Sequence, residues 1–238
     1  MDISLIIPAY NEEASIGQCL ETAIKNGKGK FKEIIVVDNA STDKTAEVAR
    51  RYPGVTVVYE ARKGTGHARQ TGAEHASGEI FAYLDADCLL PDGWLDILVH
   101  TFISDPKVVL LSGPYRYDDV SWHERWLLDA LWWVVPPVYR IVGYGANAGS
   151  LAVRKNALKA AGGFDRRIEF YGDDADLPRR LREIGRIIFR MDFFTYSSAR
   201  RYKAEGVVRS LFVYVINYFW LVLFNRVFTK VHTNVRVP

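Results

Sequence analysis

Two acidic residues, Asp85 and Asp87, directly follow an apolar run from Ile80 to Leu84. A short apolar run closed by polar residues is typical of a buried strand in a parallel sheet, and open α/β sheets bind ligands beyond the carboxyl ends of their strands. Two carboxylates this close repel each other unless a cation lies between them or each finds a donor. A hard divalent ion, helped by a substrate diphosphate, meets that need. An isolated Asp-x-Asp pair also fits an acidic turn or a helix N-cap, so other residues must decide.

Strands and helices alternate through the first half of the chain and would position this pair. The predicted strands are Ser4–Ile7, Glu33–Asp38, Val55–Tyr59 and Ile80–Leu84. The predicted helices run from about Glu12 to Ile24, from the turn at 39–43 through Arg51, and onward from Gly64–Gly66. Alternation at this pitch predicts a parallel, doubly wound sheet up to about Tyr115.

Polar residues follow each of these strands. They are Tyr10-Asn11-Glu12, Asp38-Asn39, the stretch from Gly66 to Arg69, and Asp85-Ala86-Asp87. Because the carboxyl ends of parallel strands meet at one edge of the sheet, we expect these residues to surround one ligand. Four such junctions in register favour the metal interpretation of Asp85 and Asp87 over an acidic turn.

The composition changes after Tyr115. The segment from Trp122 to Val142 is rich in tryptophan and contains Pro136-Pro137, and a glycine-rich loop at 143–149 follows it. Further on we expect a strand at Ser150–Val153, a short helix at Asn156–Ala161, and a basic helix at Leu177–Ile184.

Overall composition limits the class of protein. With 238 residues and 49% hydrophobic residues, the chain suits one α/β domain with decoration, or at most two small domains. A net charge of +3 gives no basis for nucleic acid as a partner. Two cysteines, Cys19 and Cys88, form no disulfide framework or zinc pattern, which favours a reducing compartment. No signal peptide is expected, because Asp2 precedes a run that is only strand-sized.

Taken in order, six short motifs resemble the family 2 glycosyltransferases, which have the GT-A fold and transfer a sugar from a nucleotide-sugar with inversion. The motifs are Ile7-Pro8-Ala9-Tyr10-Asn11-Glu12, Val36–Asp43, Lys63-Gly64 through Ala68-Arg69, Leu84-Asp85-Ala86-Asp87, Gly163-Phe164-Asp165 and Gly172–Leu177. The resemblance runs from Ile3 to about Arg190 and implies a Rossmann-like, mostly parallel sheet flanked by helices. It implies a nucleotide-sugar-binding half at 1–115 and an acceptor-binding and catalytic half of the same domain at 116–200. Beyond the resemblance, the residues themselves predict a basic and apolar C-terminal helix at 201–238.

The resemblance also implies the site residues. Asp38 would accept from the base imide, Glu12 would lie near the ribose, and Arg69 would face the diphosphate, while Mg²⁺ or Mn²⁺ would bind Asp85 and Asp87. The full set that we expect for the nucleotide-sugar is Pro8, Ala9, Tyr10, Glu12, Asp38, Arg69, Asp85, Ala86 and Asp87, to which Arg200 and Arg201 are added as a hypothesis of our own. Ordinary structural roles stay open: a first-turn helix acid for Glu12, a capping residue for Asp38 and a solvated helix residue for Arg69.

Asp174 matches the family's general base, which takes the proton of the acceptor hydroxyl. The preceding position holds Asp173 where the family usually has Glu, so either acid can be the base, and their clustering with Asp176 should raise at least one pKa. An acidic helix N-terminus is the alternative interpretation. Many relatives carry a further histidine ligand, which the stretch 194–201 lacks. We hypothesise that Arg200 or Arg201 holds the diphosphate instead.

The segment from Val207 to Phe228 is apolar but broken by Asn217, and basic residues precede it. Its uninterrupted apolar part is too short to span a membrane, and the combination suits an interfacial helix on anionic lipid. A helix buried in a homodimer is the alternative. The Trp122–Trp133 segment belongs either to the same membrane surface or to the core of the acceptor half.

We therefore expect an enzyme on the cytoplasmic face of the membrane that glycosylates a lipid-linked or membrane-held acceptor. A catalytically inactive nucleotide-sugar-binding scaffold is the alternative, and the acids at Asp38, Asp85, Asp87 and Asp174 speak against it. A nucleotidyltransferase shares the sheet type, but its first loop is usually glycine-rich and basic, whereas the loop at 8–12 is acidic.

Overall fold

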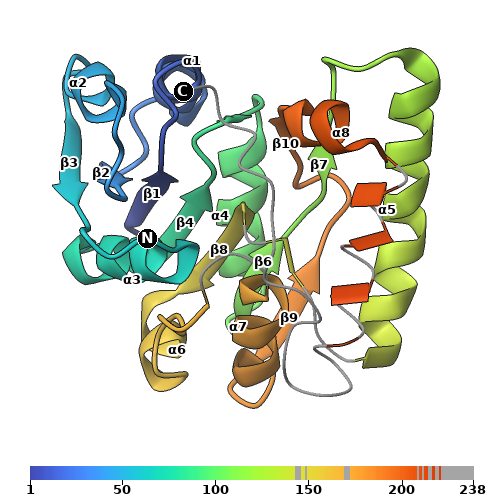
Figure 1. Ribbon diagram of the computed structural model, residues 1–238. Coiled ribbons are helices and arrows are strands. Elements are labelled where there is room, and N and C mark those ends of the chain that lie inside the picture. The colour runs from blue at the N-terminus through green and yellow to red at the C-terminus, as the bar shows by residue number, and fades with distance from the viewer. Residues whose placement is uncertain are drawn as a thin grey trace.

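The fold comes from a computed structural model, shown in Figure 1. It describes residues 1–142, 146–147, 149–168, 172–207 and the positions 209–210, 212–213, 216–217 and 220. At positions 131, 134–136, 140, 141, 173, 174 and 201 this description covers the backbone alone.

A seven-stranded sheet forms the centre of the molecule, in the order β3-β2-β1-β4-β8-β6-β9. Its strands are β1 (Ile3–Ala9), β2 (Glu33–Asp38), β3 (Val55–Tyr59), β4 (Ile80–Leu84), β6 (Val108–Ser112), β8 (Ser150–Arg154) and β9 (Arg186–Phe189). Only β8 runs antiparallel to its neighbours β4 and β6 among these strands. The predicted mostly parallel α/β sheet is confirmed, and strands from the expected second half, 116–200, enter the same sheet.

Helices cover both faces of the sheet. They are α1 (Ile16–Gly27), α2 (Thr45–Ala49), α3 (Thr65–His75), α4 (Trp94–Ser104), α5 (Trp122–Val142), α6 (Lys155–Ala160), α7 (Asp173–Leu181) and α8 (Arg200–Glu205). Alternate residues of β1 point to opposite faces. Leu5 belongs to the buried cluster that includes Leu20 of α1 and Leu98 of α4, whereas Ile6 belongs to the cluster that includes residues of α3, α6 and α7. These last three helices lie together in the lower part of Figure 1.

Several helix boundaries differ from the sequence-based expectation. α1 begins at Ile16 instead of Glu12, because the N–H groups of Ser15 and Ile16 both bind the carbonyl of Glu12 in a turn that precedes the helix. α7 begins at Asp173 instead of Leu177, so the acidic residues form its first turn. The tryptophan-rich segment is the 21-residue helix α5, which continues through Pro136-Pro137 along one side of the molecule (Figure 1).

A second, three-stranded sheet connects the late part of the chain to the acidic motif. It contains β5 (Cys88–Leu89), β10 (Thr195–Ser197) and β7 (Tyr115–Arg116), in the order β5-β10-β7. In the antiparallel pair, Ser197 lies opposite Cys88, the residue after Asp87. The chain that leaves β10 and forms α8 therefore begins beside the end of β4.

None of the described helices combines the length and apolar character needed to cross a membrane. Beyond residue 207 the description is limited to isolated positions, so the expected apolar helix at Val207–Phe228 lies outside the described residues. On α5, Trp122, Trp126 and Trp133 are 82%, 70% and 76% exposed, so the interpretation of this segment as buried core is wrong for these three side chains.

Candidate active site

The loops after β1 and β2 are joined by hydrogen bonds. Asn11 adopts a left-handed conformation (φ 51°) that asparagine tolerates. Its N–H donates to Ser41 Oγ at 3.0 Å, and its Oδ1 accepts from the N–H of Thr42 at 2.8 Å. The N–H of Glu12 donates to Thr45 Oγ1 at 2.8 Å. These bonds fix the backbone of Glu12, whose side chain is 4% exposed, at the carboxyl end of β1.

Asp38, the last residue of β2, is buried at the same edge of the sheet. Its Oδ1 accepts a hydrogen bond from the N–H of Ser41 at 3.2 Å. Since α2 begins only at Thr45, this bond closes the loop and does not cap the helix. The alternative interpretation of Asp38 as a helix-capping residue is therefore wrong.

The expected residues Pro8, Ala9 and Tyr10 end β1 and lead into the loop. Ala9 lies opposite Asp38 in the parallel pair with β2, which places the two strand ends side by side. The hydroxyl of Tyr10 accepts a hydrogen bond from Lys63 Nζ at 3.0 Å, and the same ammonium lies 4.8 Å from the centroid of the Tyr10 ring. A cation from the loop before α3 thus lies against the loop after β1.

Asn39, which we expected near the ligand, and Glu60, for which the sequence predicts no role, organise the loop that leads into α3. Asn39 Nδ2 donates to the carbonyls of Glu60 and Arg62, at 3.1 and 2.7 Å, and its Oδ1 accepts from the N–H of Gly64 at 2.9 Å. Hydrogen bonds from Arg62 are the main cause that lowers the pKa of Glu60 to about 2. The sequence signal that could have indicated this role of Asn39 is its position directly after Asp38, the last residue of β2.

Asp85 is held by two side chains. Its Oδ1 accepts from Arg69 Nη2 at 2.9 Å, and its Oδ2 accepts from the Tyr115 hydroxyl at 2.8 Å. The side chain of Arg69 is only 4% exposed, so the interpretation as a solvated helix residue is wrong. Burial, followed by the charge of Asp85, raises the pKa of Tyr115 well above its ordinary value.

Gly149 is required beside this pair. A Cβ at this position would lie 1.7 Å from the Tyr115 hydroxyl oxygen and 2.0 Å from Asp85 Oδ2, which no other residue can accept. The carbonyl of Gly149 also accepts from the N–H of Asp85 at 3.3 Å. Gly149 therefore lies directly against the first acid of the acidic motif.

Asp87 and Glu12 share one cation, the guanidinium of Arg200. Its Nη2 donates to Asp87 Oδ2 at 3.0 Å and also to Glu12 Oε1. Burial opposes the charged form of Arg200, but the hydrogen bond to Glu12 and the charges of Asp87 and Glu12 outweigh it and raise the pKa. Two acids from the ends of β1 and β4 thus converge on one positive charge.

Arg200 reaches this position because of the small sheet. It follows β10, which pairs with the strand immediately after Asp87. Asp119 then fixes the start of α8, since its carboxylate accepts from the N–H of Ala199 at 3.0 Å and from Lys203 Nζ at 3.1 Å. The side chain of Arg201 lies outside the description, so the hypothesis for that residue stays a prediction.

We call Glu12, Asp38, Arg69, Asp85 and Asp87 the donor edge. Ala86 and Cys88, which flank Asp87, are buried apolar neighbours, as expected for Cys88. Within the described residues, no group of three or more His, Cys, Asp or Glu side chains is arranged to hold a metal ion by itself.

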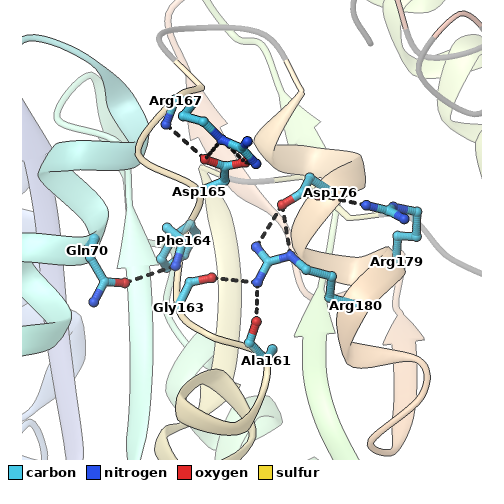
Figure 2. A network of polar contacts seen from close by, with 9 residues as sticks. All are labelled: Gln70, Ala161, Gly163, Phe164, Asp165, Arg167, Asp176, Arg179 and Arg180. Carbon is cyan, nitrogen blue, oxygen red and sulfur yellow. Dashed lines mark hydrogen bonds and ion pairs between the residues drawn. The ribbon is translucent and has the colours of Figure 1, made fainter. Parts of the chain in front are cut away.

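The base side consists of residues 161–168 and helix α7. Figure 2 shows Asp176 of α7 between two arginines: Arg180 Nη2 donates to its Oδ2 at 2.7 Å and Arg179 Nη2 to its Oδ1 at 3.2 Å. Asp173 and Asp174 belong to the first turn of α7, but their side chains lie outside the description. Their assignment as the base, and the pKa expected for their cluster, stay predictions.

Comparison with known proteins supports the motif-based resemblance. The family model described as "Glycosyl transferase family 2" matches residues 4–158. Glycosyltransferase AglE from Haloferax volcanii is 41% identical over 121 residues, which cover 48% of this chain and 40% of that protein. Dolichol-phosphate mannosyltransferase from Pyrococcus furiosus is 35% identical over 130 residues, 53% of this chain and 36% of that protein. The chain thus spans about two fifths of the length of these relatives.

A solved structure has the same fold over most of the chain. The mannosyltransferase PcManGT from Pyrobaculum calidifontis, in complex with GDP-Man and Mn²⁺, superposes with a TM-score of 0.65 at 25% identity, covering 87% of this chain and 61% of that one. Together with the matched family model, which includes the junctions after β1, β2 and β4, this shows that the chain belongs to the family 2 glycosyltransferases.

Proposed function

We propose that this chain is an inverting glycosyltransferase that moves a sugar from a UDP- or GDP-linked donor to a hydroxyl of a lipid-linked or membrane-held glycan acceptor. The observation that carries the proposal is the convergence of Glu12 and Asp87, from the loops after β1 and β4, on the guanidinium of Arg200. Such an arrangement suits a diphosphate, whose charge needs cations at the carboxyl edge of the sheet.

The donor edge supplies groups for each part of a nucleotide-sugar. Asp38 presents a buried carboxylate, which suits an N–H of the base, and Glu12 suits the ribose hydroxyls. Arg69 and Arg200 bring two permanent positive charges to the acids of the edge. When the diphosphate enters, Arg200 can exchange an acid partner for a phosphate oxygen.

The residues fit a divalent ion through Asp87. Its carboxylate already binds a cation, and Mg²⁺ is commonly held by one or two carboxylates together with substrate phosphates and water. Asp85 accepts one hydrogen bond on each oxygen, from Arg69 and from Tyr115, and the second lone pair of either oxygen could bind the ion as well. A bound Mg²⁺ or Mn²⁺ would stabilise charge on the departing nucleoside diphosphate. The structure of PcManGT in complex with GDP-Man and Mn²⁺ supports this assignment.

Asp174, with Asp173 beside it, would accept the proton of the acceptor hydroxyl as that oxygen attacks the anomeric carbon. The attack comes from the face opposite the leaving nucleotide and therefore inverts the configuration. Support comes from the position of these residues in the first turn of α7, on a different element from the donor edge.

The acceptor is proposed to be held at the cytoplasmic face of a membrane. Support comes from the dolichol-phosphate mannosyltransferase relative and from the three exposed tryptophans, which lie on one face of α5 at the spacing i, i+4 and i+11. Sedimentation with anionic liposomes tests this proposal. If replacing Trp122, Trp126 and Trp133 by serine leaves binding unchanged, α5 is not the contact surface.

The reaction is tested by a screen of nucleotide-sugars with Mg²⁺ or Mn²⁺, which measures release of nucleoside diphosphate in the presence of polyprenyl-phosphate acceptors. We expect metal-dependent release with one donor and a loss of about 10²- to 10⁴-fold in kcat for Asp174→Asn. Binding of nucleotide without any release, across all donors and acceptors, would favour the inactive scaffold instead.

A further inference from the structure

Helix α7 carries the proposed base in its first turn, and that turn lacks one of the backbone hydrogen bonds of a regular helix. Pro178 occupies the position whose N–H would otherwise bind the carbonyl of Asp174, and proline has no N–H to donate. Gly172, which precedes the helix, has a positive φ of 113°. Side-chain contacts must therefore contribute more than usual to where this turn lies.

Arg180 supplies such contacts from one guanidinium. Its Nε and Nη2 donate to Asp176 Oδ2 at 3.0 and 2.7 Å. Its Nη1 donates to the carbonyl of Gly163 at 2.7 Å and also to that of Ala161 (Figure 2). The planar guanidinium thus connects the first two turns of α7 to the loop that follows α6.

That loop also contacts α3. The N–H of Phe164 donates to Gln70 Oε1 at 2.9 Å, and the N–H of Gly66 donates to the carbonyl of Ile168 at 3.4 Å. A Cβ on Gly66 would lie 2.4 Å from the carbonyl oxygen of Asp165, so the two backbones approach as closely as glycine permits. Figure 2 shows Gln70 on one side of this loop and Arg180 on the other.

The other end of this series of contacts is the donor edge. Arg69, the neighbour of Gln70 on α3, binds Asp85 at 2.9 Å. A continuous series of hydrogen bonds and backbone contacts therefore runs from Asp85 through α3 and residues 161–168 to the first turns of α7.

We propose that Arg180, together with Asp176, is a positioning residue that sets the distance between the base on α7 and the donor edge. The proposal rests on the proposed function, because it needs Asp174 to act as the base. The residue acts through the loop at 161–168 and does not touch the substrate. Losing it would let the first turn of α7 shift, and displacements of about 1 Å at a reacting centre cost about 100-fold in rate.

Arg179 is a matched control. It is an adjacent arginine on the same helix and binds the same carboxylate through Asp176 Oδ1, but it is 44% exposed and this described contact lies within α7. Arg179→Ala removes the same charge and one bond to Asp176 while leaving the connection to Ala161 and Gly163 intact. Its kcat should stay within about threefold of wild type, as for most exposed ion pairs.

The test compares Arg180→Ala, Arg180→Lys and Arg179→Ala with the donor found in the screen. We expect Arg180→Ala to lower kcat by about 10- to 100-fold, with KM for the donor and Kd for nucleoside diphosphate within about twofold. Arg180→Lys should recover part of the loss, because one ammonium can satisfy one of the partners. Equal losses in the Arg179 and Arg180 variants would overturn the proposal.

A double variant separates this proposal from the proposed function. If Arg180 acts through the base, Arg180→Ala should cost less than about threefold in an Asp174→Asn background. A full additional loss there would overturn the positioning role, whereas an unchanged kcat in Asp174→Asn alone would overturn the base assignment instead. Should Arg180→Ala fail to fold, Gln70→Ala breaks the same series of contacts at α3 and should give the same split between kcat and KM.

Discussion

The donor edge and the base side both use arginines, but they use them differently. At the donor edge, arginines form ion pairs with buried partners: the side chains of Arg69 and Glu12 are each 4% exposed. At the base side, Arg180 is 25% exposed and divides its donors between a carboxylate and two backbone carbonyls. Removing a partner at the donor edge therefore leaves a poorly solvated charge, whereas at the base side water can replace the lost donor. We expect donor-edge variants to change stability most and base-side variants to change rate most.

The largest effect on stability is expected for Arg69→Met, which leaves Asp85 with Tyr115 as its remaining described partner. Breaking a buried pair costs about 3–5 kcal/mol, and because Asp85 is 32% exposed we expect about 3 kcal/mol in the free energy of unfolding. Urea denaturation measures it. Tyr115→Phe, which removes the other hydrogen bond but no charge, should cost about 1 kcal/mol.

Arg180→Ala is the comparison from the base side in the same urea denaturation experiment. We expect it to lower the free energy of unfolding by about 1 kcal/mol. If Arg69→Met and Arg180→Ala lose the same stability, the distinction between the two regions does not hold.

Much of the donor edge could be predicted because its signals are local. Buried runs that end in Asp38 or Asp85 mark both the strand and the place where the side chain emerges, and the parallel register brings Ala9 next to Asp38. The boundary of α1 was wrong because a turn anchored on the carbonyl of Glu12 delays the helix to Ile16, and no periodicity reports such a turn.

The partners of the acids were harder to predict because they come from distant parts of the chain. Tyr115 lies 30 residues after Asp85, and Arg200 lies 113 residues after Asp87. Both positions depend on strands of two or three residues in the small sheet, which carry no periodic pattern. Arg200 was proposed as a diphosphate ligand only because the stretch 194–201 lacks a histidine. Nothing in the sequence showed that Asp87 and Glu12 would both bind its guanidinium.

The next effect in size depends on pH and concerns Glu60, which supports the donor edge through the loop that Asn39 holds. The lowered pKa, about 2, means that the carboxylate stabilises the fold fully above its unfolded pKa near 4.5, and that this stability is lost as pH falls from 4.5 toward 2. Because Arg62 is 57% exposed, we expect only about 1–2 kcal/mol at pH 7 for Glu60→Gln.

Urea denaturation of wild type and Glu60→Gln between pH 7 and pH 3.5 measures this difference. It should be constant above about pH 5 and shrink below pH 4.5. A difference that stays the same down to pH 3.5 would mean that Glu60 acts through its shape and the bond from Thr71, not through its charge.

The smallest expected effect is a change of tenfold or less in ligand affinity when Arg200 is replaced. The affinity for Mn²⁺ alone should rise, and the affinity for UDP or GDP should fall. Without nucleotide, Arg200 occupies Asp87 and Glu12, so Mn²⁺ must displace it. Arg200→Ala should therefore raise the affinity for Mn²⁺ alone by about three- to tenfold, since a charge-assisted hydrogen bond is worth about 1.5 kcal/mol. With Mn²⁺ present, the same change should weaken UDP or GDP binding by a similar factor, because the diphosphate loses a partner.

Calorimetric titration of each ligand measures both signs, and Lys203→Ala is the control, since Lys203 is a cation of α8 that binds Asp119 and none of the donor-edge acids. A fall in both affinities would mean that Arg200 orders the site for the metal and does not compete with it. A rise in both would mean that it contributes nothing to diphosphate binding. A higher affinity for Mn²⁺ together with a lower affinity for the nucleotide would instead show that Arg200 neutralises the acids of the donor edge before the donor binds. On the base side, Arg180 binds backbone carbonyls as well as a carboxylate, so we expect no such exchange of cations there.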